Sequence, residues 1–75
     1  MKFRISRKLD TIKTVTAKTY DDAADKFARS QYGRKAVARR TAGDNDKSGY
    51  FQAYEPMKGG GLNSIGEPFH LFPLN

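Results

Sequence analysis

The sequence has no cysteine, and this absence limits the ways in which so short a chain can be stabilised. Neither a disulfide nor a zinc ion bound by cysteine thiolates can hold the fold together, which is compatible with a reducing cytosol. Because 75 residues suffice for one small domain, we expect residues 1–75 to fold as a single unit around a limited core. A large internal active-site cavity is therefore not expected.

The chain also has no long apolar run. No segment is long and apolar enough to span a bilayer, and the first ten residues, MKFRISRKLD, are too charged for a signal peptide. We therefore expect a cytoplasmic protein that has no membrane partner.

A recognisable set of catalytic residues is missing as well. His70 is the only histidine and stands in an apolar segment, where we expect a packed side chain rather than a general base. There is no cysteine nucleophile, and the serines lie in no nucleophile motif. The sequence thus predicts a protein that is not an enzyme and uses no cofactor.

Positive charge, by contrast, is abundant and unevenly distributed. The chain has 14 Lys and Arg against eight acidic residues, which gives a net charge of +6. Twelve of these basic residues and four of the acidic ones lie in residues 1–40. This asymmetry indicates an electropositive surface that suits an acidic partner, although a charge of this size also keeps small domains soluble.

Residues 19–33 have the clearest local signal, that of an amphipathic helix. Thr19 can cap the first turn, and Gly33 can end the helix in a left-handed conformation. Between them, apolar residues recur at steps of three and four and form one stripe, which needs a sheet to cover it. The stripe consists of Tyr20, Ala23, Ala24, Phe27, Ala28 and either Gln31 or Tyr32.

Alternating side chains on both sides of this helix predict strands. Residues 1–7 and 12–17 are expected to form an N-terminal hairpin, and residues 35–41 and 50–55 a second pair of strands. The predicted fold class is α+β: an antiparallel sheet of three to five strands in the order β-β-α-β-β, with the helix packed on one face.

The C-terminal part of the chain has a weaker pattern. Residues 57–67 include three consecutive glycines and are predicted to be a flexible loop. They do not form a phosphate-binding loop, because Gly61 is followed by Leu62 instead of Lys and Ser or Thr. Residues 68–75 are predicted to be a C-terminal tail or an edge strand, an optional addition to the sheet.

The segment DNDKSGYFQAYE has the spacing of a calcium-binding loop. Such loops join two helices, whereas strands are expected here, and Pro56 prevents a normal exiting helix. A polar turn between two strands explains the same residues, so no metal site is predicted. The matching residues are Asp44, Asp46, Ser48 and Glu55.

The sheet face opposite the helix is expected to combine basic and aromatic side chains. Tyrosine rings stack on bases while Arg and Lys hold phosphates, a combination that suits RNA or DNA. In the alternative, the tyrosines pair across strands and pack beneath Phe69 and Phe72. The predicted binding residues are Arg4, Arg7, Lys13, Arg39, Arg40, Tyr50, Gln52 and Tyr54.

The small size, the strands with a single helix and the lack of catalytic residues resemble the small accessory proteins of phages and plasmids, among them anti-CRISPR proteins. This resemblance implies a stoichiometric inhibitor of a host defence complex. Many members of that class are acidic mimics of nucleic acid, and this chain departs from them by being basic.

Two functions therefore stay open. The first is a non-catalytic protein that binds nucleic acid or a host nucleoprotein complex through its basic and aromatic sheet face. The second is an inhibitor that binds a host protein. In either case the chain is a monomer or a two-fold dimer that extends the sheet at an unpaired edge.

Overall fold

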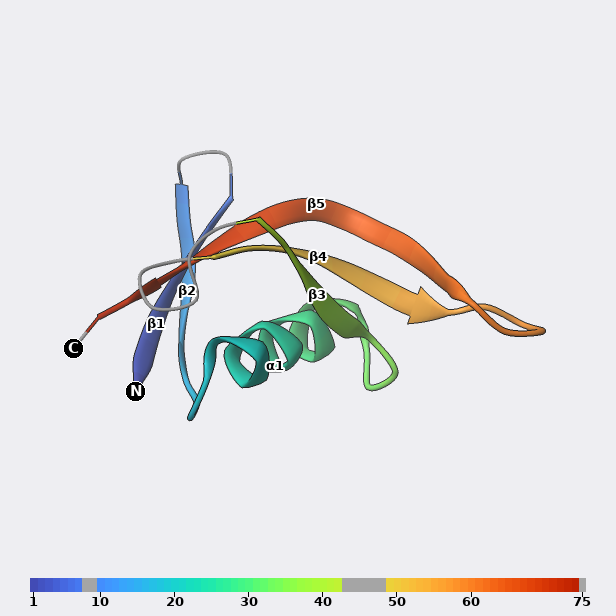
Figure 1. Cartoon of the computed structure of the whole chain (residues 1–75). Coiled ribbons are helices and arrows are strands. Elements are labelled where there is room, and N and C mark those ends of the chain that lie inside the picture. Colours follow the sequence, from blue (N-terminus) through green and yellow to red (C-terminus); the bar gives the residue numbers. More distant parts are fainter. Residues whose placement is uncertain (8–9, 43–48, 75) are drawn as a thin grey trace.

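The computed structural model describes residues 1–7, 10–42 and 49–74, which form five strands and one helix (Figure 1). The elements follow one another as β1 (Lys2–Arg7), β2 (Asp10–Thr16), α1 (Tyr20–Tyr32), β3 (Val37–Ala42), β4 (Gly49–Pro56) and β5 (Leu62–Pro73). The predicted α+β class is confirmed. Within these residues, no helix combines the length and the apolarity that crossing a membrane requires.

The five strands in the described residues form one antiparallel sheet with the spatial order β2-β1-β5-β4-β3. The last strand, β5, therefore lies in the centre of the sheet. Its Leu71 is opposite Ile5 of β1 on one side and opposite Gly49 of β4 on the other. The two ends of the chain thus meet side by side in the middle of the sheet (Figure 1).

The prediction of a C-terminal tail or an edge strand over residues 68–75 is wrong for residues 68–73, which belong to this central strand. β5 also begins at Leu62, opposite Pro56, so residues 57–61 alone connect it to β4, instead of the predicted loop over 57–67. The physical reason is that β1 and β4 each have a row of backbone N–H and C=O groups along the side that faces β5. A strand inserted between them pairs both sets of groups at once.

β5 contains a bulge opposite Gln52 of β4. Phe51 pairs with Phe69 whereas Ala53 pairs with Ile65, so residues 66–68 all stand against Gln52. Pro68 lies in this interruption of the ladder, where its missing N–H costs no strand pairing.

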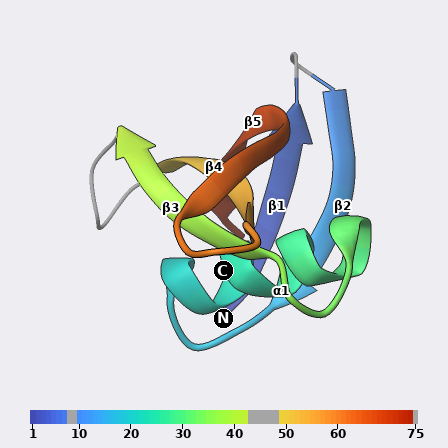
Figure 2. The same ribbon diagram turned by 90° about the vertical axis from the view of Figure 1, so that its right-hand side faces the viewer.

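The helix α1 covers one face of this sheet, as Figures 1 and 2 show from two directions. Its predicted N-cap is confirmed, because the Thr19 Oγ1 accepts a hydrogen bond from the Asp22 N–H at 3.1 Å. Gly33 ends the helix as predicted, with a positive φ of 114°, but its ψ of 167° differs from that of the predicted left-handed helical conformation. The predicted apolar stripe is the buried one. Its alanines let the helix lie close to the sheet, where large rings of the strands fill the remaining space. The buried residues of the stripe are Tyr20, Ala23, Ala24, Phe27 and Ala28.

Polar contacts hold α1 against both edge strands. The Lys26 Nζ donates to the Thr16 carbonyl oxygen of β2 at 2.7 Å. On the other side, the Ala38 N–H of β3 donates to the Asp25 Oδ1 at 2.8 Å. The helix therefore bridges the two edges of the sheet.

We predict that Gly66→Ala lowers the free energy of unfolding by about 1–3 kcal/mol. Gly66 has a φ of 69°, which alanine rarely adopts, and its added Cβ would occupy the space of the Tyr32 hydroxyl. Urea denaturation measures the change.

Gly60→Ala is the matched control, because Gly60 also has a positive φ, 106°, but no described atom lies within 4 Å of its added Cβ. In a Tyr32→Phe background, part of the loss at Gly66 should be recovered. Equal decreases in the free energy of unfolding for Gly66→Ala and Gly60→Ala would contradict the packing of Tyr32 against the bulge.

Candidate functional site

Side chains alternate along each strand between the face covered by α1 and the opposite face. Phe3 and Ile5 of β1 are fully buried under the helix, so Lys2 and Arg4 point the other way. We call this opposite surface the open face. From the strand registers, it holds Lys2, Arg4, Ser6, Thr14, Thr16, Arg39, Tyr50, Gln52, Tyr54, His70 and Phe72.

Three rings form a continuous strip on the open face, which we call the aromatic strip: Tyr50, His70 and Phe72. Tyr50 of β4 and His70 of β5 are cross-strand partners, and their rings stack with centroids 3.9 Å apart and planes at 13°. The centroids of His70 and Phe72 are 4.0 Å apart. Such pairs stabilise the sheet beyond simple burial, by about 0.5–1.5 kcal/mol each.

A cation ends this strip at β1. Arg4 lies opposite Phe72, and its Cζ is 4.7 Å from the centroid of that ring. A guanidinium in this position interacts with the π-electrons of the ring while its donors stay available to other groups. The open face thus combines stacked aromatic surface with an adjoining positive charge.

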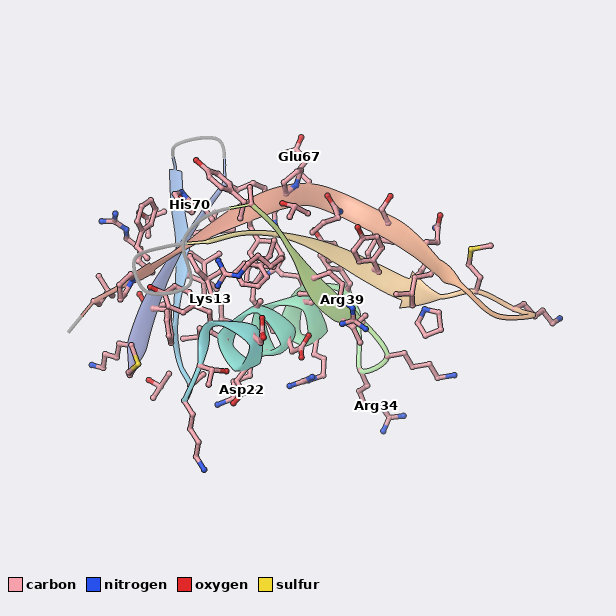
Figure 3. All side chains as sticks on the ribbon, viewed as in Figure 1. Lys13, Asp22, Arg34, Arg39, Glu67 and His70 are labelled. Atoms are coloured by element: carbon pink, nitrogen blue, oxygen red, sulfur yellow. The ribbon has the colours of Figure 1, made fainter. Side chains whose placement is uncertain are left out.

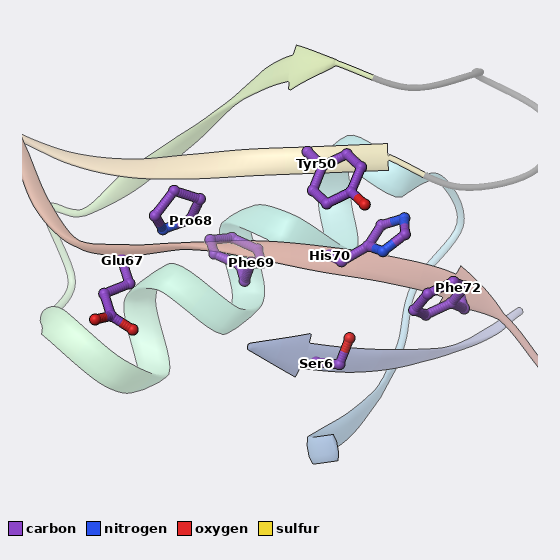
Figure 4. A pocket seen from close by; sticks show the side chains of 7 residues that line it. All are labelled: Ser6, Tyr50, Glu67, Pro68, Phe69, His70 and Phe72. Carbon is purple, nitrogen blue, oxygen red and sulfur yellow. The ribbon is translucent and has the colours of Figure 1, made fainter. Parts of the chain in front are cut away.

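A hollow of about 460 Å³ lies next to the strip (Figure 4). It forms where β1 ends: Ser6 is the last β1 residue that pairs with β5, so in the described residues no strand flanks the bulge on that side. The volume falls within the roughly 300–1,000 Å³ of small-ligand pockets. The lining residues are Ser6, Tyr50, Glu67, Pro68, Phe69, His70 and Phe72.

The surroundings of His70 favour its neutral form. Partial burial among the neighbouring rings lowers the pKa of His70 below its usual 6.5, and the positive charge of Arg4 lowers it further. The Nε2 atom of His70 is buried and has no hydrogen-bond partner in the described residues. The strip is therefore an uncharged aromatic surface with positive charge beside it.

The structure brings five of the eight predicted binding residues together on the open face: Arg4, Arg39, Tyr50, Gln52 and Tyr54. Gln52 already has a structural role there. Its Nε2 lies 3.1 Å, 3.0 Å and 3.3 Å from the carbonyl oxygens of Ala53, Ile65 and Gly66. The side-chain amide thus holds the bulge of β5 in place.

Arg40, another of the predicted binding residues, does not lie on the open face. It lies opposite Phe51, on the helix side of the sheet, with its Cζ 4.8 Å from the Phe51 ring centroid and 5.3 Å from that of Tyr20. Gly49 makes room for it, because a Cβ at this position would collide with the guanidinium. Consecutive strand residues point to opposite faces, so Arg39 and Arg40 cannot share one surface.

Arg7 and Lys13, two further predicted binding residues, also lie on the helix side, away from the open face. The Lys13 Nζ donates to the Ser30 Oγ of α1 at 3.0 Å. A register shift in the β1–β2 hairpin puts Lys13 opposite the buried Ile5. The Cζ of Arg7 is 5.8 Å from the ring centroid of the buried Phe27.

Sequence reasoning missed His70, Phe72, Ser6 and Glu67 as parts of the site. The alternation of buried Phe69 and Leu71 with His70 and Phe72 was available as a signal. These residues lie beside Tyr50 because β5 is a central strand. No local sequence pattern predicts the position of a strand within a sheet.

The calcium-loop match concerns Asp44, Asp46 and Ser48, which lie outside the described residues. Glu55, the last residue of that match, is exposed on β4 opposite Asn63.

Comparisons of the chain with models of protein families, with curated proteins and with solved structures found no match.

We predict that His70 makes stability depend on pH. Because its folded-state pKa lies below the unfolded value of about 6.5, the unfolded chain binds more protons between these values. The free energy of unfolding should therefore be undiminished above about pH 6.5 and fall as the pH drops toward the folded-state pKa.

Denaturation of the wild type and of His70→Phe at several pH values tests this, because the variant should lose that part of the pH dependence. NMR titration of the single histidine should also give a pKa below 6.5. Identical pH profiles for the two proteins would contradict the assignment.

We also predict that Gln52→Ala lowers the free energy of unfolding by about 1–3 kcal/mol, because carbonyl groups at the bulge lose their donor. Gln31→Ala, on the exposed side of α1, should change it by less than about 0.5 kcal/mol. Thermal denaturation of both variants checks the difference, and equal effects would refute the structural role of Gln52.

Proposed function

We propose that the open face binds single-stranded nucleic acid, RNA or DNA, free or within a nucleoprotein complex, and that the protein acts without catalysis. The observation that supports this best is the aromatic strip, flanked by Arg4, on a sheet face that α1 leaves uncovered. The net charge of +6 favours the same class of partner.

Stacking supplies the first part of the binding energy. Tyr50 is 46% exposed, so its ring has surface available to a base even while it stacks on His70. Base–aromatic stacking contributes about 1–3 kcal/mol per base and tolerates different sequences, because every base has a π-face.

Phosphate contacts supply the second part. Lys2 and Arg4 on β1 stand on one side of the strip, and Arg39 on β3 stands on the other. Since β5 and β4 lie between β1 and β3, the two sets are separated by three strand spacings, about 14 Å, and also by an offset along the strands, because Arg39 lies opposite Gln52. A single nucleic-acid strand that runs across the sheet can therefore stack its bases on the aromatic strip. Its phosphates can then reach the basic residues on both sides of the strip.

We predict that labelled single-stranded RNA or DNA binds the protein with an affinity that falls steeply with salt, as fluorescence anisotropy will show. Arg4→Ala should weaken binding and reduce the slope of log K against log salt by about 1. Tyr50→Ala should weaken binding by about 1–3 kcal/mol with little change in that slope.

Arg34→Ala is the matched control, since it removes the same charge from the turn beyond α1, on the other side of the molecule (Figure 3). Its effect should be smaller than that of Arg4→Ala. Equal effects of the two substitutions, or no binding at low salt, would refute the proposed interface.

A second candidate function is a stoichiometric inhibitor that binds a host protein. The hollow favours it, because an apolar pocket beside Arg and Tyr residues resembles the centre of a protein–protein hot spot. A complex with a protein partner that survives nuclease treatment would support this function, and loss of the complex on such treatment would count against it.

A further inference from the structure

We propose that the protein forms a two-fold dimer in which residues 62–64 of β5 pair, antiparallel, with the same residues of a second copy. The β4–β5 hairpins of the two copies would then join edge to edge in one continuous sheet. This inference goes beyond the proposed function, because the surface that it assigns lies along the edge of the hairpin and the partner is this chain itself.

One side of β5 is unpaired along most of its length. β4 pairs with β5 from Leu62 to Leu71 apart from the bulge, whereas β1 pairs only with residues 70–73. Within the described residues, no strand lies along the other side of residues 62–69. Figure 1 shows the hairpin extending past α1, and the molecule is elongated, 41 × 21 × 21 Å. An unpaired strand side of this kind is a template for pairing with another chain.

The turn of the hairpin decides which backbone groups point to the unpaired side. The Met57 N–H donates to the Gly61 carbonyl oxygen at 3.1 Å, so these two residues form a hydrogen-bonded pair. Hydrogen-bonded and non-hydrogen-bonded pairs alternate along an antiparallel ladder, so Leu62 and Ser64 belong to non-hydrogen-bonded pairs with β4. Pro56, opposite Leu62, agrees with this assignment because it has no N–H to donate. The N–H and C=O groups of Leu62 and Ser64 therefore point away from β4.

The two outer strands of the sheet, β2 and β3, are less suited to such pairing. Side chains of α1 already bind backbone groups of both, at Thr16 and at Ala38. Both strands also carry basic side chains, such as Lys13 and Arg39. A two-fold axis brings the same residues of two copies together, so like charges would meet there. Residues 62–66, by contrast, have no charged side chain, so a second copy can approach them without repulsion.

The segment is also complementary to itself. A two-fold axis at Asn63 places Leu62 of each copy opposite Ser64 of the other, so that the outward N–H and C=O groups of both residues find partners. The two Asn63 residues then face each other, and their amides can both donate and accept hydrogen bonds. Leu62, which is 44% exposed in the single chain, is partly covered by the second copy. This register also stays clear of Gly66, where Tyr32 lies against the bulge.

The dimer has a consequence for the open face. Opposite residues of paired strands project their side chains to the same face of a sheet, so the two open faces would lie on one side of the dimer. One nucleic-acid strand that contacts both copies would then bind with a higher apparent affinity than a single face allows. This consequence rests on the proposed function, whereas the dimer itself does not.

Analytical ultracentrifugation from micromolar to millimolar concentration tests the dimer. The wild type should self-associate, and Leu62→Lys should weaken the association by roughly tenfold or more, because it places two cations beside the axis. Ile12→Lys is the matched control, since Ile12 on the outer strand β2 is 43% exposed and Leu62 is 44% exposed. It should associate like the wild type. Circular dichroism spectra that match the wild type establish that each variant is folded.

The absence of cysteine permits a sharper test of the register. Opposite residues of a non-hydrogen-bonded pair have Cα atoms about 4.5 Å apart, within the range that a disulfide spans. Asn63→Cys should therefore cross-link the dimer rapidly under mild oxidation. Glu55→Cys is the matched control, because Glu55 is exposed on β4 opposite Asn63. The two copies of this residue would be three strand spacings apart, about 14 Å, which is too far for a disulfide.

Each outcome decides for or against the dimer. Association that Leu62→Lys weakens and Ile12→Lys keeps, together with rapid cross-linking of Asn63→Cys, supports the inference. A monomer at every concentration overturns it. So does a dimer that only Ile12→Lys disrupts, which would place the interface at β2, or cross-linking of Glu55→Cys as fast as that of Asn63→Cys. The oligonucleotide binding of the single chain is measured separately, so failure of the dimer leaves the proposed function standing.

Discussion

The insertion of β5 between β1 and β4 is the constraint on which the rest of this structure depends. Residues 3–6 pair with residues 70–73, so the two ends of the chain must come together before the sheet is complete. Such non-local pairing has a large loop-closure entropy, which opposes its formation. Once formed, it contributes Phe69 and Leu71 to the core and His70 and Phe72 to the open face.

The same strand explains why a small protein with a tightly filled core has a hollow on its surface. β5 is longer than β1, and its bulge lies beyond the point where β1 stops pairing. Two features stabilise the bulge: Gln52 donates hydrogen bonds to its carbonyl groups, and Gly66 leaves space for the Tyr32 hydroxyl. Gln52, a predicted binding residue, therefore holds the shape of the bulge, and Glu67 and Pro68 of the bulge line the hollow.

Charge is distributed over both faces of the sheet, and this changes what the net charge of +6 means. Arg7, Lys13 and Arg40 lie on the helix side, where they contact rings or a hydroxyl of the protein itself. On the open face, Arg4 contacts the Phe72 ring, while Lys2 lies opposite Thr16 and Arg39 opposite Gln52. Binding there is thus expected to combine stacking with a few phosphate contacts, instead of relying on a dense basic patch.

Elements with local signals can be predicted from the sequence. The helix, its Thr19 and Gly33 caps, its buried stripe and the strands on either side of it follow from periodicity and capping, because neighbours three or four residues apart decide them. Tertiary structure alone decided the rest. The place of β5 depends on pairing with residues more than sixty positions away, and the register shifts that set the face of a side chain such as Lys13 depend on the partner strand. A candidate site made of Arg4, Tyr50, His70 and Phe72 comes from three strands, so it exists only once those strands lie side by side.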